Sequence, residues 1–228
     1  MVTTTVIGKG LYRIPDAARL ANIPLSTLRT WLKGYTSTYK DKRYSHPPRW
    51  MTQIDPSSSV VGFLDLVEAR TIGLFRRAGV RWSTIIAARA AAKEQMDEDY
   101  PFATLRLMTN GRLIIHEVGE SKHDRALVEI TTSNRVFDPI MRPFFVQELD
   151  IEDEMAVRWW PLGKQRAVVL DPEKSFGRPI VAGYGVPTRV LAAAVRGQGS
   201  VDAAARWFEV SISAVKDAVE FERRLKAA

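Results

Sequence analysis

The chain has 228 residues, of which 46% are hydrophobic and 26% are charged, an ordinary balance for a globular protein that buries a core. It contains no cysteine, which excludes disulfides, thiolate metal ligands and cysteine nucleophiles. His46, His116 and His123 are far apart and lack the spacing of metal ligands. No nucleophile, base and orienting residue stand at a recognisable spacing. We therefore expect a protein that is not an enzyme and has no metal and no cofactor.

The net charge of +7 is concentrated at one end of the chain. Residues 1–60 contain nine Lys and Arg but only three Asp and Glu. A partner responds to such a local field, so an anionic partner is expected there, although a solvated basic face is an equally good reading. The sequence has no apolar run near 18 residues, and MVTTTVIGKG lacks the pattern of a signal peptide. We expect a cytoplasmic protein with no membrane partner.

Residues 13–34, RIPDAARLANIPLSTLRTWLKG, contain two short helical patterns around Asn22-Ile23-Pro24. Pro15 suits the first turn of a helix over 16–21, and a second helix begins at Leu25, with Ser26 as its expected cap. Leu25, Leu28 and Leu32 recur at helical spacing and bury one face. Each helix is too short to be stable alone, so the pair predicts a helix-turn-helix.

The other face of the second helix provides the candidate DNA contacts. They are Ser26, Thr27, Arg29, Thr30 and Lys33. Arg29 is the strongest candidate because a guanidinium in the first turns of a recognition helix reaches a guanine edge or a phosphate. The alternative is a surface ion pair with Asp16. Trp31 suits either the core or a contact with the DNA backbone.

Aromatic and basic residues alternate after Gly34, in YTSTYKDKRYSHPPRW. This pattern predicts a small hairpin, or wing, that turns at residues 40–43. Lys40, Lys42 and Arg43 then lie at its tip and reach an adjacent groove of the DNA, unless they are simply solvated.

The middle of the chain gives weaker signals. Amphipathic helices are expected from Phe63 to near Gly79 and from Ser83 to about Asp99, and they could form an antiparallel pair. LRLM and RLIIHEV flank Asn110-Gly111, a dipeptide that favours a tight hairpin, so strands are expected there. Pro139 and Pro143 interrupt any long helix in residues 137–154. MAVRWWPLG and RAVVLDP predict two further strands.

Residues 204–216, AARWFEVSISAVK, repeat the pattern of residues 17–29, AARLANIPLSTLR, at a constant offset of 187. Ser200 and Ser211 are the expected caps of a second pair of helices. Lys216 takes the place of Arg29, but the nearby Asp217 and Glu220 weaken its attraction for phosphate. The second pair is therefore expected to serve mainly assembly.

Two resemblances follow from these motifs. Residues 13–34, the basic hairpin and FLDLVEARTIGLFRRAGVRWSTI resemble the DNA-binding head of MerR-type winged-helix regulators. The segment from VVLDPEK onward, marked by Gly177-Arg178-Pro179 and Val186-Pro187-Thr188, resembles a small antitoxin domain of unknown function. Chains that join both parts are similar to VapB-type antitoxins, which are encoded beside PIN-domain ribonuclease toxins. Unlike the metal-sensing MerR proteins, this chain lacks cysteines and a long dimerisation helix after the head.

These resemblances imply a mainly α protein with small β elements, of the α+β class. Residues 1–100 are expected to form the winged helix-turn-helix, residues 101–165 a central β-containing connection, and residues 166–228 the antitoxin-type helical domain. The implied partners are double-stranded operator DNA, a PIN-domain toxin and, because one head reads only half a site, a second copy of the chain.

The resemblance also implies how the toxin is held. PIN-like nucleases gather carboxylates in their active site, so the blocking groups are expected to be arginines beside an apolar anchor. The candidates are Trp159, Trp160, Arg178, Arg189 and Arg196. Alternatively, Trp159 and Trp160 belong to core strands, and Arg178 and Arg189 pair within the domain with Asp171 and Glu173. The alternative function is a MerR-like transcriptional regulator that senses a small molecule.

Overall fold

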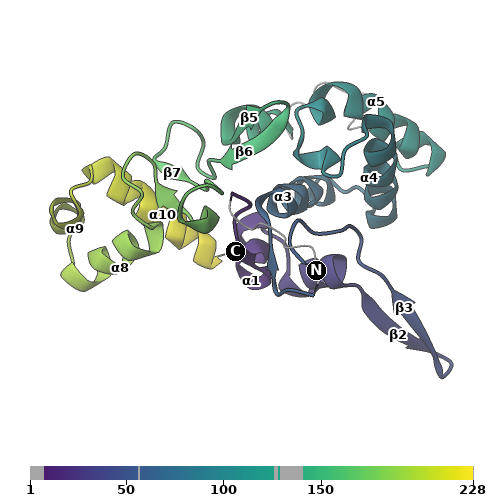
Figure 1. The fold of residues 1–228 in the computed structure, drawn as a ribbon, viewed down its shortest axis with the longest axis horizontal. Helices are drawn as coiled ribbons and strands as arrows, with labels where there is room; N and C mark the ends of the chain where they lie inside the picture. The colour runs from purple at the N-terminus through teal and green to yellow at the C-terminus, as the bar shows by residue number, and fades with distance from the viewer. Residues whose placement is uncertain (1–7, 56, 126–127, 129–140, 228) are drawn as a thin grey trace.

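The computed structural model describes residues 8–55, 57–125, 128 and 141–227 (Figure 1). Its helices are α1 (Ile14–Ala21), α2 (Leu25–Lys33), α3 (Phe63–Arg77), α4 (Trp82–Met96), η1 (Pro101–Ala103), α5 (Arg106–Ser121), η2 (Pro143–Glu148), η3 (Ser175–Gly177), α8 (Thr188–Gln198), α9 (Val201–Phe208) and α10 (Ile212–Ala227). Its strands are β1 (Tyr12–Arg13), β2 (Tyr35–Tyr39), β3 (Lys42–His46), β4 (Val60–Val61), β5 (Leu149–Glu152), β6 (Met155–Trp159), β7 (Val168–Val169) and β8 (Ile180–Val181). Pro139, expected to interrupt a helix, lies outside the described residues.

The expected α+β class is confirmed, because helices dominate and the sheets are small. Four antiparallel two-stranded sheets pair β1 with β4, β2 with β3, β5 with β6 and β7 with β8. One large core runs from Tyr12 to Leu170 and also includes Phe221, whereas a smaller core joins β8 to α8, α9 and α10. Figure 1 shows these last helices at one end of the molecule, α4 and α5 at the other, and α1 and α3 between them.

The helix-turn-helix forms as its local signals predict. Asn22 ends α1 in the left-handed region (φ 56°), and Ile23, only 8% exposed, plugs the turn while its N–H donates to the Ala18 carbonyl at 2.9 Å. The expected cap of α2 is wrong, however, because Pro24 occupies the N-cap position and Ser26 already lies inside the helix. The carbonyl of Ser26 instead accepts the Thr30 hydroxyl at 2.8 Å.

The expected hairpin around Asn110-Gly111 is also wrong, because α5 runs through this dipeptide. Leu107 and Ile115 are both fully buried, and their spacing of eight residues places them on one face of a helix. That face packs mainly against α4, so tertiary contact overrides the local turn preference. Helix α4 therefore packs mainly against α5 and only slightly against α3.

The segment before α1 meets η3 at Tyr12. Its ring lies between Gly10 and Gly177, and the neighbouring Leu11 N–H donates to the Phe176 carbonyl at 2.8 Å. The Tyr12 hydroxyl is buried and, within the described part of the chain, has no hydrogen-bond partner. Burial also raises the pKa of Tyr12 far above its ordinary value. This junction joins β1 to η3, in the segment that precedes the C-terminal helices.

Candidate nucleic-acid interface

The face of α2 that carries the DNA candidates is open to solvent. Leu28 and Leu32 are buried against the core, whereas Arg29 on the opposite side is exposed. Asp16, its suggested partner, pairs instead with Arg19 at 2.6 Å. Arg29 forms no ion pair with the described residues, so its guanidinium is available for an anionic partner.

The other α2 candidates have more constrained surroundings. Ser26 is exposed and Thr27 is half-buried. The Thr30 hydroxyl donates within its own helix, although its oxygen can still accept a hydrogen bond. Lys33 donates to the backbone carbonyl of Ser58 and so anchors the segment before β4. Lys33 therefore contributes to holding α2 in position.

The β2–β3 hairpin projects from the rest of the molecule (Figure 1). Lys40 and Asp41 at its turn have φ of 46° and 60°, the left-handed pair that matches the twist of a two-residue hairpin loop. Lys40, Lys42 and Arg43 are all exposed. At the base of the hairpin, Tyr35 stacks on His46 with ring centroids 4.2 Å apart, which stiffens it. The tip of the hairpin therefore carries three exposed cations, and the stacked rings stabilise its base.

Two arginines that sequence reasoning missed join this surface. A cavity of about 390 Å³ beside α2 is lined by Thr27, Thr30, Arg49 and Arg76, with Trp31 and Trp82 below. The two indoles stack at 4.2 Å, so Trp31 belongs to the core. Arg49, Arg76 and Trp82 are brought together only by the tertiary packing. No local sequence pattern indicates that they share a surface with α2.

A buried polar network lies in the core of the N-terminal part of the chain. Arg89 donates to Glu68 at 2.6 Å, and the second oxygen of Glu68 accepts the Phe102 N–H at 2.7 Å. Asp65 accepts the Trp50 indole N–H at 3.1 Å, and burial raises the pKa of Asp65 to about 6. Burial likewise raises the pKa of Glu68, while Arg89 opposes this rise. The network joins α3 to α4 and to the segment that follows the hairpin.

The second helix pair repeats the first almost residue for residue. Helix α9 spans the positions of α1 shifted by 187, and α10 begins at the position where α2 begins, with the same shift. Ser200 caps α9 and Ser211 caps α10, as expected. Glu209 adopts the left-handed conformation of Asn22, with φ of 54°. The outer surface differs, because Asp217, the counterpart of Thr30, pairs with Arg166 at 2.6 Å and also accepts the Ala167 N–H. This face of α10 is therefore used to hold β7.

The residues expected to bind the toxin do not form a single surface in the structure. Trp159 is only 2% exposed and donates to Glu148 at 2.9 Å, so its expected place on a binding surface is wrong. Its indole packs in the core beside Phe144, with ring centroids 6.0 Å apart. Burial is favourable there because it removes the large apolar surface of the ring from water. Trp160 is half-buried and donates to Asp150 at 2.8 Å.

The three expected arginines remain exposed, but not all at one place. Arg178 and Arg189 line the same cleft, whereas Arg196 is not among the residues that line it. The suggested pairing with Asp171 is not what the structure shows, since Asp171 pairs with Arg158 at 3.3 Å and Lys174 at 3.5 Å.

An exposed tryptophan that sequence reasoning did not single out is Trp207, 75% of whose surface is open to solvent. It is the counterpart of Leu20, which is only 8% exposed and belongs to the large core. In the second helix pair the same position belongs to neither core among the described residues. An exposed indole on a rigid helix is a typical interface anchor.

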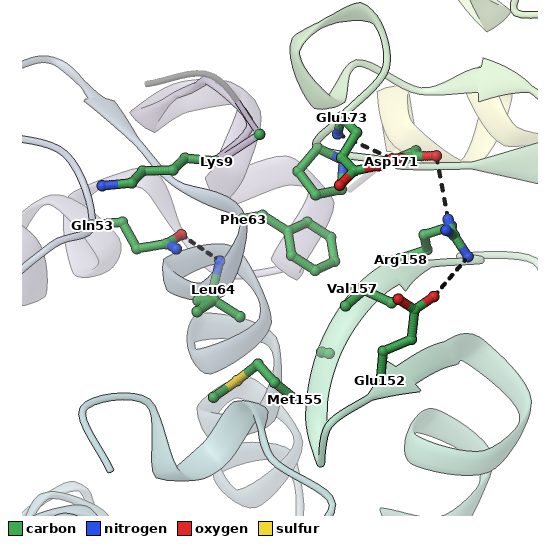
Figure 2. A pocket seen from close by; sticks show the side chains of 13 residues that line it. Lys9, Gln53, Phe63, Leu64, Glu152, Met155, Val157, Arg158, Asp171 and Glu173 are labelled. Carbon is green, nitrogen blue, oxygen red and sulfur yellow. Dashed lines mark hydrogen bonds and ion pairs between the residues drawn. The ribbon is translucent and has the colours of Figure 1, made fainter. Parts of the chain in front are cut away.

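The cavity drawn in Figure 2 lies between the start of α3 and the β6–β7 region and has a volume of about 170 Å³. Arg158 dominates its polar side and lies between Asp171, at 3.3 Å, and Glu152, at 3.5 Å. On the other side, Gln53 accepts the Leu64 N–H at 2.7 Å and so holds the first turn of α3. The charges at the centre of this cavity are already paired, so it is a structural junction.

Comparison with known proteins gives the class of the N-terminal part. Residues 10–89 match the family model described as "Putative DNA-binding HTH domain", so the chain carries a DNA-binding domain of the helix-turn-helix type.

Similarity to individual proteins extends over nearly the whole chain. The "Putative antitoxin VapB45" of Mycobacterium tuberculosis is 25% identical over 92% of this chain and 92% of its own length. The "Uncharacterized protein Rv2308" of the same organism is 24% identical over 100% of this chain and 96% of its own. The crystal structure of Rv2018 from M. tuberculosis has the same fold, with a TM-score of 0.69 and 23% identity over 91% of this chain and 96% of that one. Among the described residues, no helix combines the length and apolar composition needed to cross a bilayer.

Proposed function

We propose that the protein is the DNA-binding antitoxin of a type II toxin–antitoxin pair, with no catalytic activity of its own. It represses its own operon as a homodimer and neutralises a PIN-like ribonuclease by direct binding. The observation that carries the DNA part is the unpaired, exposed Arg29 on α2 beside a hairpin with three cations at its tip. Together they form a MerR-like winged head in which helix and hairpin reach neighbouring grooves.

The DNA part is tested by fluorescence anisotropy with the full chain and a duplex taken from upstream of its own gene. Arg29→Ala is expected to cost about 1–3 kcal/mol for the specific site, because a base contact is lost. Lys42→Ala is expected to weaken all duplexes nearly equally and to reduce the salt slope by about one.

Lys216→Ala is the matched control, since Lys216 occupies the position of Arg29 in the second helix pair. Its replacement is expected to leave the affinity almost unchanged. A loss as large as that of Arg29→Ala would mean that both helix pairs read DNA. If the intact protein binds no duplex at low salt, the DNA part of the proposal is wrong.

Toxin binding is proposed for the C-terminal helices. Here the similarity to a protein named as an antitoxin is supported by the exposed Trp207, which takes the role of anchor expected for Trp159, and by Arg196 as an exposed cation. Trp160, which is half-buried and donates to Asp150, is not part of this proposed contact. Tryptophan and arginine commonly carry most of the binding energy of an interface.

The toxin part is tested by co-expression with the neighbouring gene, followed by mass measurement of the purified complex. The wild type is expected to rescue growth and to co-purify with the nuclease, whereas Trp207→Ala is expected to lose both. Trp160→Ala is the control for removal of an indole elsewhere. Full rescue by Trp207→Ala would exclude α9 as the toxin contact while leaving DNA binding untouched.

A further inference from the structure

A cleft of about 460 Å³ lies where the helix-turn-helix meets the C-terminal helices. One wall comes from β1 and α1, and the other from the segment before β8, the start of α8 and the end of α10. Its volume is within the range of sites for small organic molecules. Apolar side chains, Leu20 and Leu225 among them, form part of its lining. It is distinct from the α2 surface, since it shares no lining residue with the cavity beside that helix.

Four arginines from distant parts of the sequence converge on this cleft: Arg13, Arg19, Arg178 and Arg189. Arg19 is paired with Asp16 at 2.6 Å. The other three form no ion pair with the residues that the structure describes, and all are exposed. Like charges repel, so such convergence lowers stability unless an anion is bound between them.

The two acidic side chains in the cleft do not cancel this charge. Asp16 is held by Arg19, and Glu222 accepts the Thr188 hydroxyl at 2.6 Å. Four guanidinium groups against two carboxylates leave a formal charge of +2. In addition, α8 begins in the wall at Thr188 without a side-chain cap, and the start of a helix favours negative charge.

We propose that this cleft is a binding site for a small organic phosphate, held by Arg178 and Arg189 from one wall and Arg13 from the other. A guanidinium fork binds two phosphate oxygens at once, which a lone ammonium group does not. The apolar lining receives the organic body of the ligand. This site goes beyond the proposed antitoxin function, because it concerns neither operator DNA nor toxin, and the two proposals fail independently.

The test is isothermal titration calorimetry of the full chain with pyrophosphate, which presents two linked phosphate groups, at constant ionic strength. Arg178→Gln and Arg189→Gln, made separately, are each expected to weaken binding about tenfold or more, as expected for loss of a charge-assisted hydrogen bond. Arg196→Gln removes an equally exposed arginine from the same α8 helix and is expected to change nothing. An unchanged urea midpoint without ligand shows that each variant folds.

Two further titrations test whether the measured binding comes from this cleft and whether it requires phosphate. Arg29→Ala must retain pyrophosphate binding, since the DNA surface is separate. Citrate, a carboxylate anion of similar size, must bind at least tenfold more weakly. No binding by the wild type, equal weakening in Arg196→Gln, loss in Arg29→Ala, or equal binding of citrate would each overturn the proposal.

Discussion

Replacement of Arg89 by Met tests the buried polar network that joins α3 to α4. The side chains of Arg89 and Glu68 are 6% and 0% exposed, and their nearest N and O atoms are 2.6 Å apart. The guanidinium also donates to the Asp99 carbonyl at 2.7 Å and lies 5.3 Å from the centre of the Trp50 ring. Arg89→Met leaves Glu68 buried with the Phe102 N–H as its remaining donor.

The expected loss is about 3–5 kcal/mol of unfolding free energy, the usual cost of removing one partner from a buried ion pair. That is a large part of the roughly 5–15 kcal/mol that stabilises a typical domain. Burial already raises the pKa of Glu68, so without Arg89 this pKa rises further. The loss is therefore largest above that pKa and shrinks as falling pH protonates the carboxyl group.

Urea unfolding at pH 7 measures the effect, provided that the m-value is unchanged. Lys93→Met is the matched control, because Lys93 lies on the same helix and pairs with Asp99 in the open, with side-chain exposures of 51% and 74%. Its expected cost is at most about 1 kcal/mol. The double variant Glu68→Leu, Arg89→Met should recover much of the loss, since neither partner of the pair is then left buried without the other. If Arg89→Met costs no more than Lys93→Met, the reasoning is refuted.

Three other predictions concern stability. Gly177→Ala is expected to destabilise the fold by about 1–3 kcal/mol more than Gly183→Ala. Both glycines have φ near +79°, but only a Cβ at position 177 would lie 2.3 Å from the Tyr12 hydroxyl. Equal urea midpoints of the two variants would contradict this. Burial raises the pKa of Asp65 to about 6 from an ordinary 3.8, so its contribution to the unfolding free energy falls by about 2 kcal/mol as pH rises from 4 to 6. Asp65→Asn should lose that slope in unfolding measured across this range. Ser200→Ala should cost about 1 kcal/mol by thermal unfolding because a cap is lost, whereas Ser26→Ala, which caps nothing, should cost less than half of that.

The parts of the fold that the sequence predicts correctly depend on local signals. Pro15, Pro24 and the leucine spacing define the first two helices, and Ser200 and Ser211 define the repeat of them. The errors arise where tertiary packing decides. Asn110-Gly111 favours a turn, but the apolar face of α5 is buried against α4 and a helix forms.

The candidate site shows the same division. Spacing alone predicts that Arg29 points away from the leucines, and the exposed cations of the hairpin follow from its turn. The cleft and the contributions of Arg49 and Arg76 could not be predicted, because they depend on which distant segments meet. Trp159 was misplaced for a related reason, since a tryptophan in a strand suits a buried or an open face equally well until its neighbours are known.

The place of Phe221 in the large core has a consequence for the order of folding. This core begins at Tyr12, so its first and last members are about 200 residues apart along the chain. Contacts at such separation form late, because a long stretch of chain must be ordered before they stabilise it. During synthesis, the helix-turn-helix emerges well before α10, which covers part of its inner face. The DNA-binding head therefore reaches its final packing only after the C-terminal helices have been made.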